Sequence, residues 1–169
     1  MSGETVLALV GLGANLGAPV DQLEAAMDAL EALATTPSAM RRSALWASAP
    51  VDCPPGSPDF VNAVVALPVA PGTDPEALLA RLLDLEQAAG RARSVRNAPR
   101  SLDLDLLLFG EHVLATPRLT LPHPRGHLRA FVLLPAAAVA PDQSWPGTGR
   151  TIAELAADVP GRDGVRRLA

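Results

Sequence analysis

The segment from Pro99 to Phe109 holds the residues best suited to chemistry, because two acids alternate there with leucines. Alternate side chains of a strand share a face, so Asp103 and Asp105 lie on one face, about 7 Å apart at ~3.4 Å per residue. Two neighbouring carboxylates near a core repel each other and lose hydration unless a cation compensates them. Mg²⁺ is the natural candidate, since one or two carboxylates hold it while substrate phosphates add oxygens, and two such ions can clamp a phosphoryl displacement. The alternative is a strand whose acids only face solvent.

A cluster of arginines comes directly before this strand. Four of the 14 arginines fall within ten residues, namely Arg91, Arg93, Arg96 and Arg100. Guanidinium groups bind phosphate through two parallel hydrogen bonds and offset the charge that develops in a transition state. The chain has no lysine, so a P-loop lysine, a Schiff base and a lysine general base are all excluded. Anion recognition is left to arginine, histidine, backbone amides or a metal, although such a run taken alone is also typical of a solvated face.

Two other motifs are weaker candidates for a site. The glycines of residues 11–17 are spaced one residue off the dinucleotide fingerprint, so we expect a tight strand-to-helix turn there, with Asn15 positioning neighbouring loops. His123 and His127 lie four residues apart, but prolines on both sides of His123 break the helix that a metal-binding pair needs. Contact with a phosphate is the better interpretation of His123.

Composition narrows the class of protein. With 169 residues, 49% hydrophobic and 19% charged, the chain fits one globular domain over residues 1–169. A net charge of −4 argues against a large nucleic-acid surface, and no apolar run is long enough to cross a membrane. Cys53 is the only cysteine and is expected to be inert, while Glu4 replaces the basic start of a secretory signal. We expect a cytoplasmic protein, a monomer or weak dimer, that binds small molecules and neither nucleic acid nor membrane.

Hydrophobic periodicity and turn residues predict the elements that would position these groups. The expected order is a strand at Val6–Leu12, a helix from Pro19 to about Thr36, mixed alternation over Ser38–Ser48, a strand at Phe60–Val69, a helix capped by Thr73 or Asp74 and running through Ala89, a strand at Leu102–Phe109, an apolar stretch at 130–139 and a short helix at Thr151–Ala157. This β-α-β-β-α-β order followed by helix predicts an α+β fold, a ferredoxin-like antiparallel sheet with helices packed on it.

Two details of this pattern are also predictions. Strict alternation places Leu107 and Phe109 on the same face as the acids, with the other leucines of that strand opposite. The second helix is expected to bury a stripe that includes Leu82 and Leu83.

Five segments, taken together, resemble the 6-hydroxymethyl-7,8-dihydropterin pyrophosphokinases of folate biosynthesis. The resemblance covers about residues 5–142 and leaves 143–169 as a C-terminal tail. The matching segments are Gly11 to Gly17, Ser57 to Val64, Glu86 with Gly90 to Arg93, Pro99 to Asp105, and Leu121 to Pro124 followed by Arg129 to Phe131. The chain departs from the family pattern in a loop Arg96-Asn97-Ala98-Pro99-Arg100, where many relatives have Arg-Trp-Gly-Pro-Arg. It also has Leu83 where some members have a polar ATP contact, and Pro124 in place of a frequent tyrosine.

The resemblance implies transfer of pyrophosphate from ATP to the hydroxymethyl oxygen of the dihydropterin, with release of AMP. Two Mg²⁺ ions would be held by Asp103 and Asp105, and the catalytic arginines would be Arg91 and Arg100. The implied ATP contacts are Glu86, Arg93, Arg96, Arg118, Thr120, His123 and Arg129. The implied pterin contacts are Ser48, Phe60, Asn62 and Phe131, together with backbone groups of the loop 50–55. The ring would lie between the two phenylalanines, for which ordinary core packing is the alternative.

Two other function classes remain open from the residues alone. A two-metal nucleotidyltransferase or cyclase also uses paired carboxylates on a sheet of this kind. A sheet that binds RNA is less suited to this chain, because it has no tyrosine and only three phenylalanines for base stacking. The nucleotide product separates the two enzyme classes, since AMP is expected only for pyrophosphate transfer to an acceptor.

Overall fold

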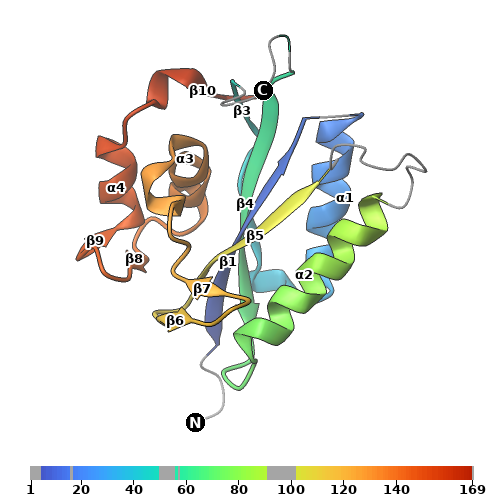
Figure 1. The fold of residues 1–169 in the computed structure, drawn as a ribbon, viewed down its shortest axis with the longest axis vertical. Coiled ribbons are helices and arrows are strands. Elements are labelled where there is room, and N and C mark those ends of the chain that lie inside the picture. Colours follow the sequence, from blue (N-terminus) through green and yellow to red (C-terminus); the bar gives the residue numbers. More distant parts are fainter. Residues whose placement is uncertain (1–4, 16, 50–55, 57, 91–101, 169) are drawn as a thin grey trace.

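A computed structural model describes residues 5–15, 17–49, 56, 58–90 and 102–168. These residues form a central antiparallel sheet with helices on both faces (Figure 1). The strands are β1 (Val6–Ala14), β2 (Arg41–Arg42), β3 (Trp46–Ser48), β4 (Phe60–Val69), β5 (Asp103–Phe109), β6 (Leu114–Ala115), β7 (Thr120–Leu121), β8 (Ser144–Trp145), β9 (Arg150–Thr151) and β10 (Val165–Arg167). The helices are α1 (Pro19–Glu31), α2 (Pro75–Gly90), α3 (Ala130–Val139) and α4 (Ile152–Asp158), with short 3₁₀ turns at Pro37–Ala39, Gly126–Leu128 and Arg162–Gly164.

The strand order confirms the expected fold class. The main sheet runs β10-β3-β4-β1-β5, with β2 also paired to β4, and each pairing is antiparallel. The segment with mixed alternation supplies both β2 and β3. β1 lies between β4 and β5 and pairs with both, as the first strand of a ferredoxin-like sheet does. The predicted bounds of β4 are those of the structure.

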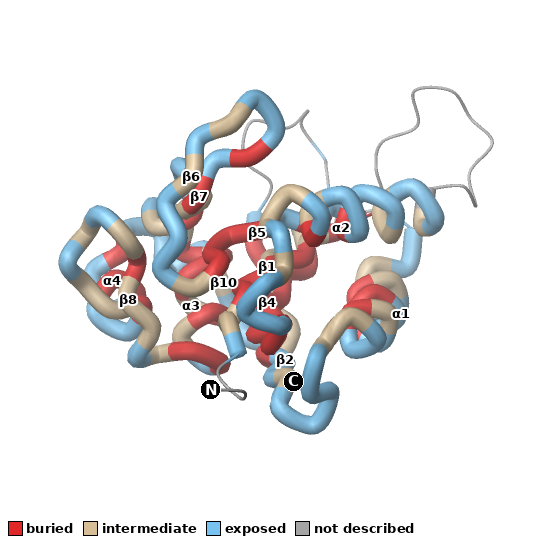
Figure 2. The backbone as a smooth tube through the Cα atoms, turned by 90° about the horizontal axis from the view of Figure 1, so that it is seen from below, coloured by how far each residue is buried: buried red, intermediate tan, exposed pale blue. Residues whose placement is uncertain are grey.

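Each face of the sheet packs on its own pair of helices. Side chains such as Val10, Val65 and Leu106 point to one face, where they pack with α1 and α2. Side chains such as Leu9 and Val64 point to the other face, where they pack with α3 and α4. Buried segments therefore concentrate along the sheet and the helix sides that face it (Figure 2). Among the described residues, no helix has the length and apolar character needed to span a membrane.

The glycine-rich segment differs from its prediction. β1 continues through Ala14, so Gly11 and Gly13 lie within the strand and not in a turn after it. A Cβ atom at Gly11 would lie 3.3 Å from Leu107 Cδ1, which is a tight contact. The expectation for Asn15 is confirmed, because its side-chain amide donates to the Pro58 carbonyl at 3.4 Å and joins two loops.

The acidic strand β5 also departs from strict alternation. The register between β1 and β5 shifts between Leu9 and Val10, because β5 has one extra residue there. Beyond this bulge, Phe109 packs in the cluster with α1 and α2, whereas Leu108 packs in the cluster with α3 and α4. The prediction that Phe109 continues the acidic face is therefore wrong, because a bulge reverses the faces of the residues that follow it.

Helices α1 and α2, which pack on one face of the sheet, differ from their predictions at two points. The first helix ends at Glu31, earlier than predicted, and a 3₁₀ turn occupies Pro37–Ala39. The cap of α2 is confirmed at Asp74, whose carboxylate accepts a hydrogen bond from the Glu76 backbone at 3.2 Å. Leu83 is 45% exposed and does not belong to the buried stripe.

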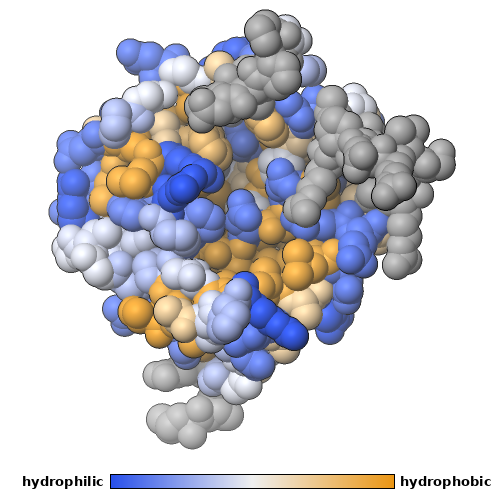
Figure 3. Space-filling view, viewed as in Figure 1, coloured by the Kyte–Doolittle hydropathy of each residue, from blue (hydrophilic) through white to orange (hydrophobic). Residues whose placement is uncertain are grey.

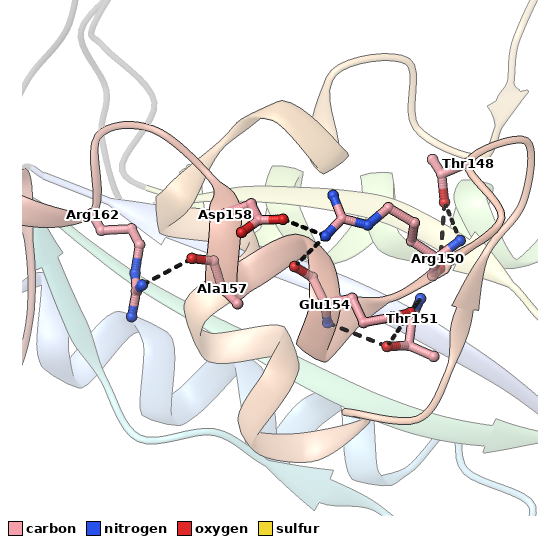
Figure 4. A network of polar contacts seen from close by, with 7 residues as sticks. All are labelled: Thr148, Arg150, Thr151, Glu154, Ala157, Asp158 and Arg162. Carbon is pink, nitrogen blue, oxygen red and sulfur yellow. Dashed lines mark hydrogen bonds and ion pairs between the residues drawn. The ribbon is translucent and has the colours of Figure 1, made fainter.

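The C-terminal tail forms part of the second helical layer, which is the layer of α3 and α4 on the other face of the sheet. The hairpin β8-β9 leads into α4, whose first turn is closed by reciprocal hydrogen bonds between Thr151 and Glu154 (Figure 4). These bonds lower the pKa of the Glu154 carboxyl. Arg150 pairs with the Asp158 carboxylate, which links the hairpin to the last turn of α4. The chain then returns to the sheet, where β10 pairs with β3.

Candidate active site

A cavity of about 560 Å³ lies between the sheet and the N-terminal end of α3. Its walls come from β1, β3, β4, β5, α3 and the segment 160–165. Hydrophilic side chains surround apolar ones in the hollow between the second helical layer and the sheet (Figure 3). The cavity brings together seven of the residues predicted from the sequence, namely Ser48, Phe60, Asn62, Asp103, Asp105, Arg129 and Phe131.

The two acids form one end of this cavity. Asp103 is paired across β1 with Gly13, and Asp105 is paired with Gly11. Since a glycine has no side chain, the sheet surface next to the two carboxylates is open to the cavity. Both aspartates are exposed. They face the cavity and not the packed core, so the expectation of carboxylates near a core is corrected here.

The other end of the cavity is aromatic and amide-lined. Asn62 is 5% exposed and donates a hydrogen bond to the Ser48 hydroxyl at 2.8 Å. Phe60 is paired with Ser48 on the neighbouring strand, and Phe131 reaches the cavity from the first turn of α3. Both phenylalanines are half-buried. This end offers two aromatic rings and a fixed amide to a flat polar ring.

A cation lies next to the aromatic group on α3. The Arg129 guanidinium carbon is 5.5 Å from the centre of the Phe131 ring, close enough for a cation–π contact. Arg129 precedes the first residue of α3 and lines the cavity. The arrangement gives the cavity a positive group beside its aromatic end, where an anionic substrate group would be stabilised.

Hydrogen bonds from outside the sheet fix the edge of β5 that faces away from β1. The Glu86 carboxylate, from α2, accepts a hydrogen bond from the Leu104 backbone at 2.6 Å. The His123 backbone donates to the Leu107 carbonyl at 2.8 Å. Leu104 lies between the two aspartates, so Glu86 holds the backbone from which both carboxylates project.

His123 lies beside the acidic end without lining the cavity. Burial lowers the pKa of its ring below 6.5, and Arg129 and Arg125 lower it further, while the Asp105 carboxylate acts in the opposite direction. The ring Nδ1 accepts a hydrogen bond from the Arg125 backbone at 3.1 Å, which places the proton of the neutral ring on Nε2. A neutral ring with its N–H on Nε2 is a hydrogen-bond donor suited to a phosphate oxygen.

We expect His123 to titrate below pH 6.5 in the metal-free protein. Since the unfolded chain then takes up this proton first, the free energy of unfolding should fall as pH falls through the window just below 6.5. NMR titration of the three histidines, with His123→Gln for assignment, measures the midpoint. A midpoint at or above 6.5, or a stability profile that His123→Gln leaves unchanged, contradicts the expectation.

Other predicted residues lie away from the cavity or outside the described residues. Arg118 and Thr120 are exposed on the β6-β7 hairpin. Arg91, Arg93, Arg96 and Arg100 lie outside the residues that the structure describes, as do Cys53 and the loop 50–55. The motif Leu121-Pro122-His123-Pro124 contains a cis peptide bond between Leu121 and Pro122.

Sequence reasoning missed two parts of the cavity. Gly11 and Gly13 form its floor, although the spacing suggested a turn. Pro160, Gly161, Gly164 and Val165 form one wall, although the tail was given no role. The periodic pattern of a three-residue strand is too short to detect, and only the pairing of β10 with β3 shows where the tail returns.

The donor set at the acidic end fits a hard cation. Oxygen ligands from two carboxylates suit Mg²⁺, which takes its remaining ligands from water and substrate phosphates. Among the described residues, no group of three or more His, Cys, Asp or Glu side chains is placed to hold a metal. The pair at Asp103 and Asp105 therefore fits an ion shared with a bound substrate more closely than a metal site built from protein ligands alone.

Solved structures share this arrangement of elements. The chain matches Plasmodium falciparum HPPK-DHPS in a crystal structure of a triple mutant with SDX-DHP, at a TM-score of 0.73 and 14% identity, over 98% of this chain and 48% of that one. The wild-type protein with pteroate gives a TM-score of 0.70 at 14% identity, over 93% and 45% of the two chains. This chain spans about half the length of those chains, and at such identity the likeness shows the fold.

Comparison with sequence relatives identifies the family of this chain. The chain is 45% identical over 159 residues to a 2-amino-4-hydroxy-6-hydroxymethyldihydropteridine pyrophosphokinase of Pseudomonas aeruginosa, covering 94% of both chains. It is 41% identical to the protein of the same name from Synechocystis, over 88% of this chain and 73% of the relative. Residues 9–141 match the model of a family described as 7,8-dihydro-6-hydroxymethylpterin-pyrophosphokinase. Fold and sequence thus agree, and the chain belongs to the 7,8-dihydro-6-hydroxymethylpterin-pyrophosphokinase family.

Proposed function

We propose that this chain transfers pyrophosphate from ATP to 6-hydroxymethyl-7,8-dihydropterin and releases AMP. One observation carries the proposal within the structure: a single cavity has two exposed carboxylates at one end and two phenylalanines with a buried amide at the other. The first end suits a metal-bound polyphosphate, and the second suits a flat ring with polar edges. Family membership supports the same reaction.

The reaction needs the two substrates to meet within the cavity. The hydroxymethyl oxygen attacks the β-phosphorus of ATP, the bond from that phosphorus to the oxygen bridging to the α-phosphate breaks, and AMP leaves with this oxygen. The attacking hydroxyl releases its proton to water. Holding both reactants in one cavity lowers the entropic part of the barrier.

The residues divide between the two substrates. Asp103 and Asp105 would hold two Mg²⁺ ions, which supply charge neutralisation at the phosphates when bound. Phe60 and Phe131 would stack on the pterin, and Asn62 would bond to its polar edge while Ser48 holds the amide in place. Arg129 and the Nε2–H of His123 would donate to phosphate oxygens.

The remaining predicted contacts are proposals from family resemblance. Arg91 and Arg100 would neutralise the group in transfer, with Arg93 and Arg96 as supporting cations. Arg118 and Thr120 would contact ATP from the β6-β7 hairpin. A monomeric or weakly dimeric state, a cytoplasmic location and the absence of a nucleic-acid partner also stay predictions from the sequence.

The nucleotide product tests the proposal. We expect purified protein to convert ATP to AMP only when both Mg²⁺ and 6-hydroxymethyl-7,8-dihydropterin are present, as followed by chromatography. Appearance of ADP would indicate an ordinary kinase. Release of free pyrophosphate would indicate a nucleotidyltransferase or cyclase.

The hydrogen bond from Leu104 to Glu86 leads to a separate prediction about metal dependence. Glu86→Ala removes the acceptor that holds the backbone between the two aspartates, so the segment that carries both carboxylates loses a restraint on the side away from β1. We expect the Mg²⁺ concentration for half-maximal AMP release to rise about tenfold or more, the scale typical of a residue that orients metal ligands. Glu86→Gln keeps an acceptor oxygen, so its half-maximal Mg²⁺ concentration should lie close to that of the wild type. An unchanged Mg²⁺ titration for Glu86→Ala would argue that this bond has no positioning role.

A further inference from the structure

The segment 160–165 forms a wall of the cavity although it follows the residues that match the family model. Val165 is paired with Ser48, and Ser48 is paired with Phe60 on the next strand. Paired residues of a sheet share a face, so these three residues form one row beside the aromatic end. The tail therefore reaches the cavity at its aromatic end.

This wall lies far from the acids. The sheet order places β10 at one edge and β5 at the other, four strand spacings apart, or about 19 Å at ~4.8 Å per spacing. A group bound at Asp103 and Asp105 is therefore separated from Val165 by the width of the sheet. The ligand that meets the wall is the one bound between Phe60 and Phe131.

The wall is held in place from both sides. The β10 backbone pairs with β3, and the Leu168 backbone donates to the Leu45 carbonyl at 2.8 Å. On the other side, the 3₁₀ turn at Arg162–Gly164 contacts α3, and Val165 packs against the cluster formed by α3 and α4. Gly161 has a φ of 86°, a left-handed conformation that favours glycine and turns the chain from α4 toward β10. A surface fixed in this way can exclude a ligand by shape.

The chemistry of the wall also points to exclusion by shape. Its cavity-lining residues are Pro160, Gly161, Gly164 and Val165, and none of them carries a charge. Such a surface offers a flat ring apolar contact and a limit to its size, and the polar bonds that orient the ring would come from Asn62.

We propose that residues 160–165 are a specificity-determining wall that limits the size of the ring system accepted at the aromatic end of the cavity. The inference rests on the proposed function, because it takes the dihydropterin as the ring bound there. It adds the tail of this chain to the substrate site.

Gly164 allows a direct test. A Cβ atom at Gly164 meets no heavy atom within 4 Å, so Gly164→Leu should fold, and its side chain would take up space at the cavity wall. We expect the KM for the pterin to rise about tenfold or more, the scale by which added methylene groups change pocket selectivity, with the KM for ATP within about twofold of wild type. A pterin KM within about twofold of wild type in the folded variant would overturn the proposal.

Gly72→Leu is the matched control. Gly72 also has open space around a built Cβ, has no left-handed φ and does not line the cavity. Both KM values of this variant should equal those of wild type. If Gly72→Leu raised the pterin KM as much as Gly164→Leu, the effect would not come from the wall and the proposal would fail.

A second variant enlarges the site. Val165→Ala removes two methyl groups from the wall and should raise kcat/KM for a dihydropterin with a bulkier ring substituent relative to the parent compound. If the ratio of kcat/KM for the bulkier dihydropterin to that for the parent compound did not change, the wall would not determine size.

Fluorescence titration with 6-hydroxymethylpterin gives Kd values for the same variants. If the wild type released no AMP, the proposed function would be wrong. The wall would still be supported if Gly164→Leu raised the Kd for 6-hydroxymethylpterin and Gly72→Leu left it unchanged.

Discussion

Asp105→Asn should abolish most AMP release while the protein remains folded. The Asp105 carboxylate is exposed to the cavity, so its loss opens no void in the core. Replacing it with a neutral amide removes one of the two charges proposed to hold Mg²⁺. Metal-derived stabilisation of a transition state is worth several kcal/mol, so we expect kcat to fall by about 10³-fold.

The measurement is initial-rate AMP release across a Mg²⁺ titration, with Tm recorded for each variant. Asp142→Asn changes an exposed aspartate in the turn after α3 and is the matched control for loss of one negative charge. It should keep wild-type turnover. Full Mg²⁺-dependent activity in Asp105→Asn would contradict the proposal that Asp105 holds Mg²⁺.

Phe131→Ala should raise the KM for the pterin by about 10- to 100-fold. The ring of Phe131 lines the cavity, and stacking of a heteroaromatic base on an aromatic side chain is worth about 1–3 kcal/mol. The contact between the ring and Arg129 is lost as well, so the KM for ATP is expected to rise by a smaller factor. Steady-state kinetics with each substrate varied in turn separates the two effects.

Two variants control for lost packing in α3. Leu134 is half-buried on the same helix and packs in the same cluster without lining the cavity. Leu134→Ala should lower Tm as Phe131→Ala does but leave the pterin KM unchanged. Phe131→Tyr keeps the ring and should retain most pterin affinity. Equal KM values for Phe131→Ala and wild type would mean that this ring only fills the core.

Long elements of this fold were predictable because each repeats one pattern over many residues. β4 is apolar except for Asn62, and its predicted bounds match the structure. Local rules failed where a partner strand determines the conformation. Gly11 and Gly13 look like turn residues, yet they continue β1 because β4 and β5 pair with them on both sides. The bulge in β5 also depends on register with β1, so alternation alone misplaced Phe109.

The site was predictable where residue type reveals chemistry. Asp103 and Asp105 stand out because acids interrupt an apolar strand, and Phe60 and Phe131 stand out because aromatic residues are scarce in this chain. Wall residues such as Val165 carry no such signal, since a valine near a chain end resembles any short apolar segment. Glu86 is an intermediate case. Family resemblance suggested an ATP contact, whereas its hydrogen bond to Leu104 depends on how α2 packs against β5.

Label transfer from ATP tests the central claim most directly. With ATP radiolabelled in either its γ- or its α-phosphate, Mg²⁺ and 6-hydroxymethyl-7,8-dihydropterin, we predict that the γ-label passes to the pterin product and the α-label stays in AMP, with one AMP formed for each diphosphate ester. Transfer of the γ-label alone with formation of ADP, or its release as free pyrophosphate, would contradict pyrophosphate transfer at this cavity.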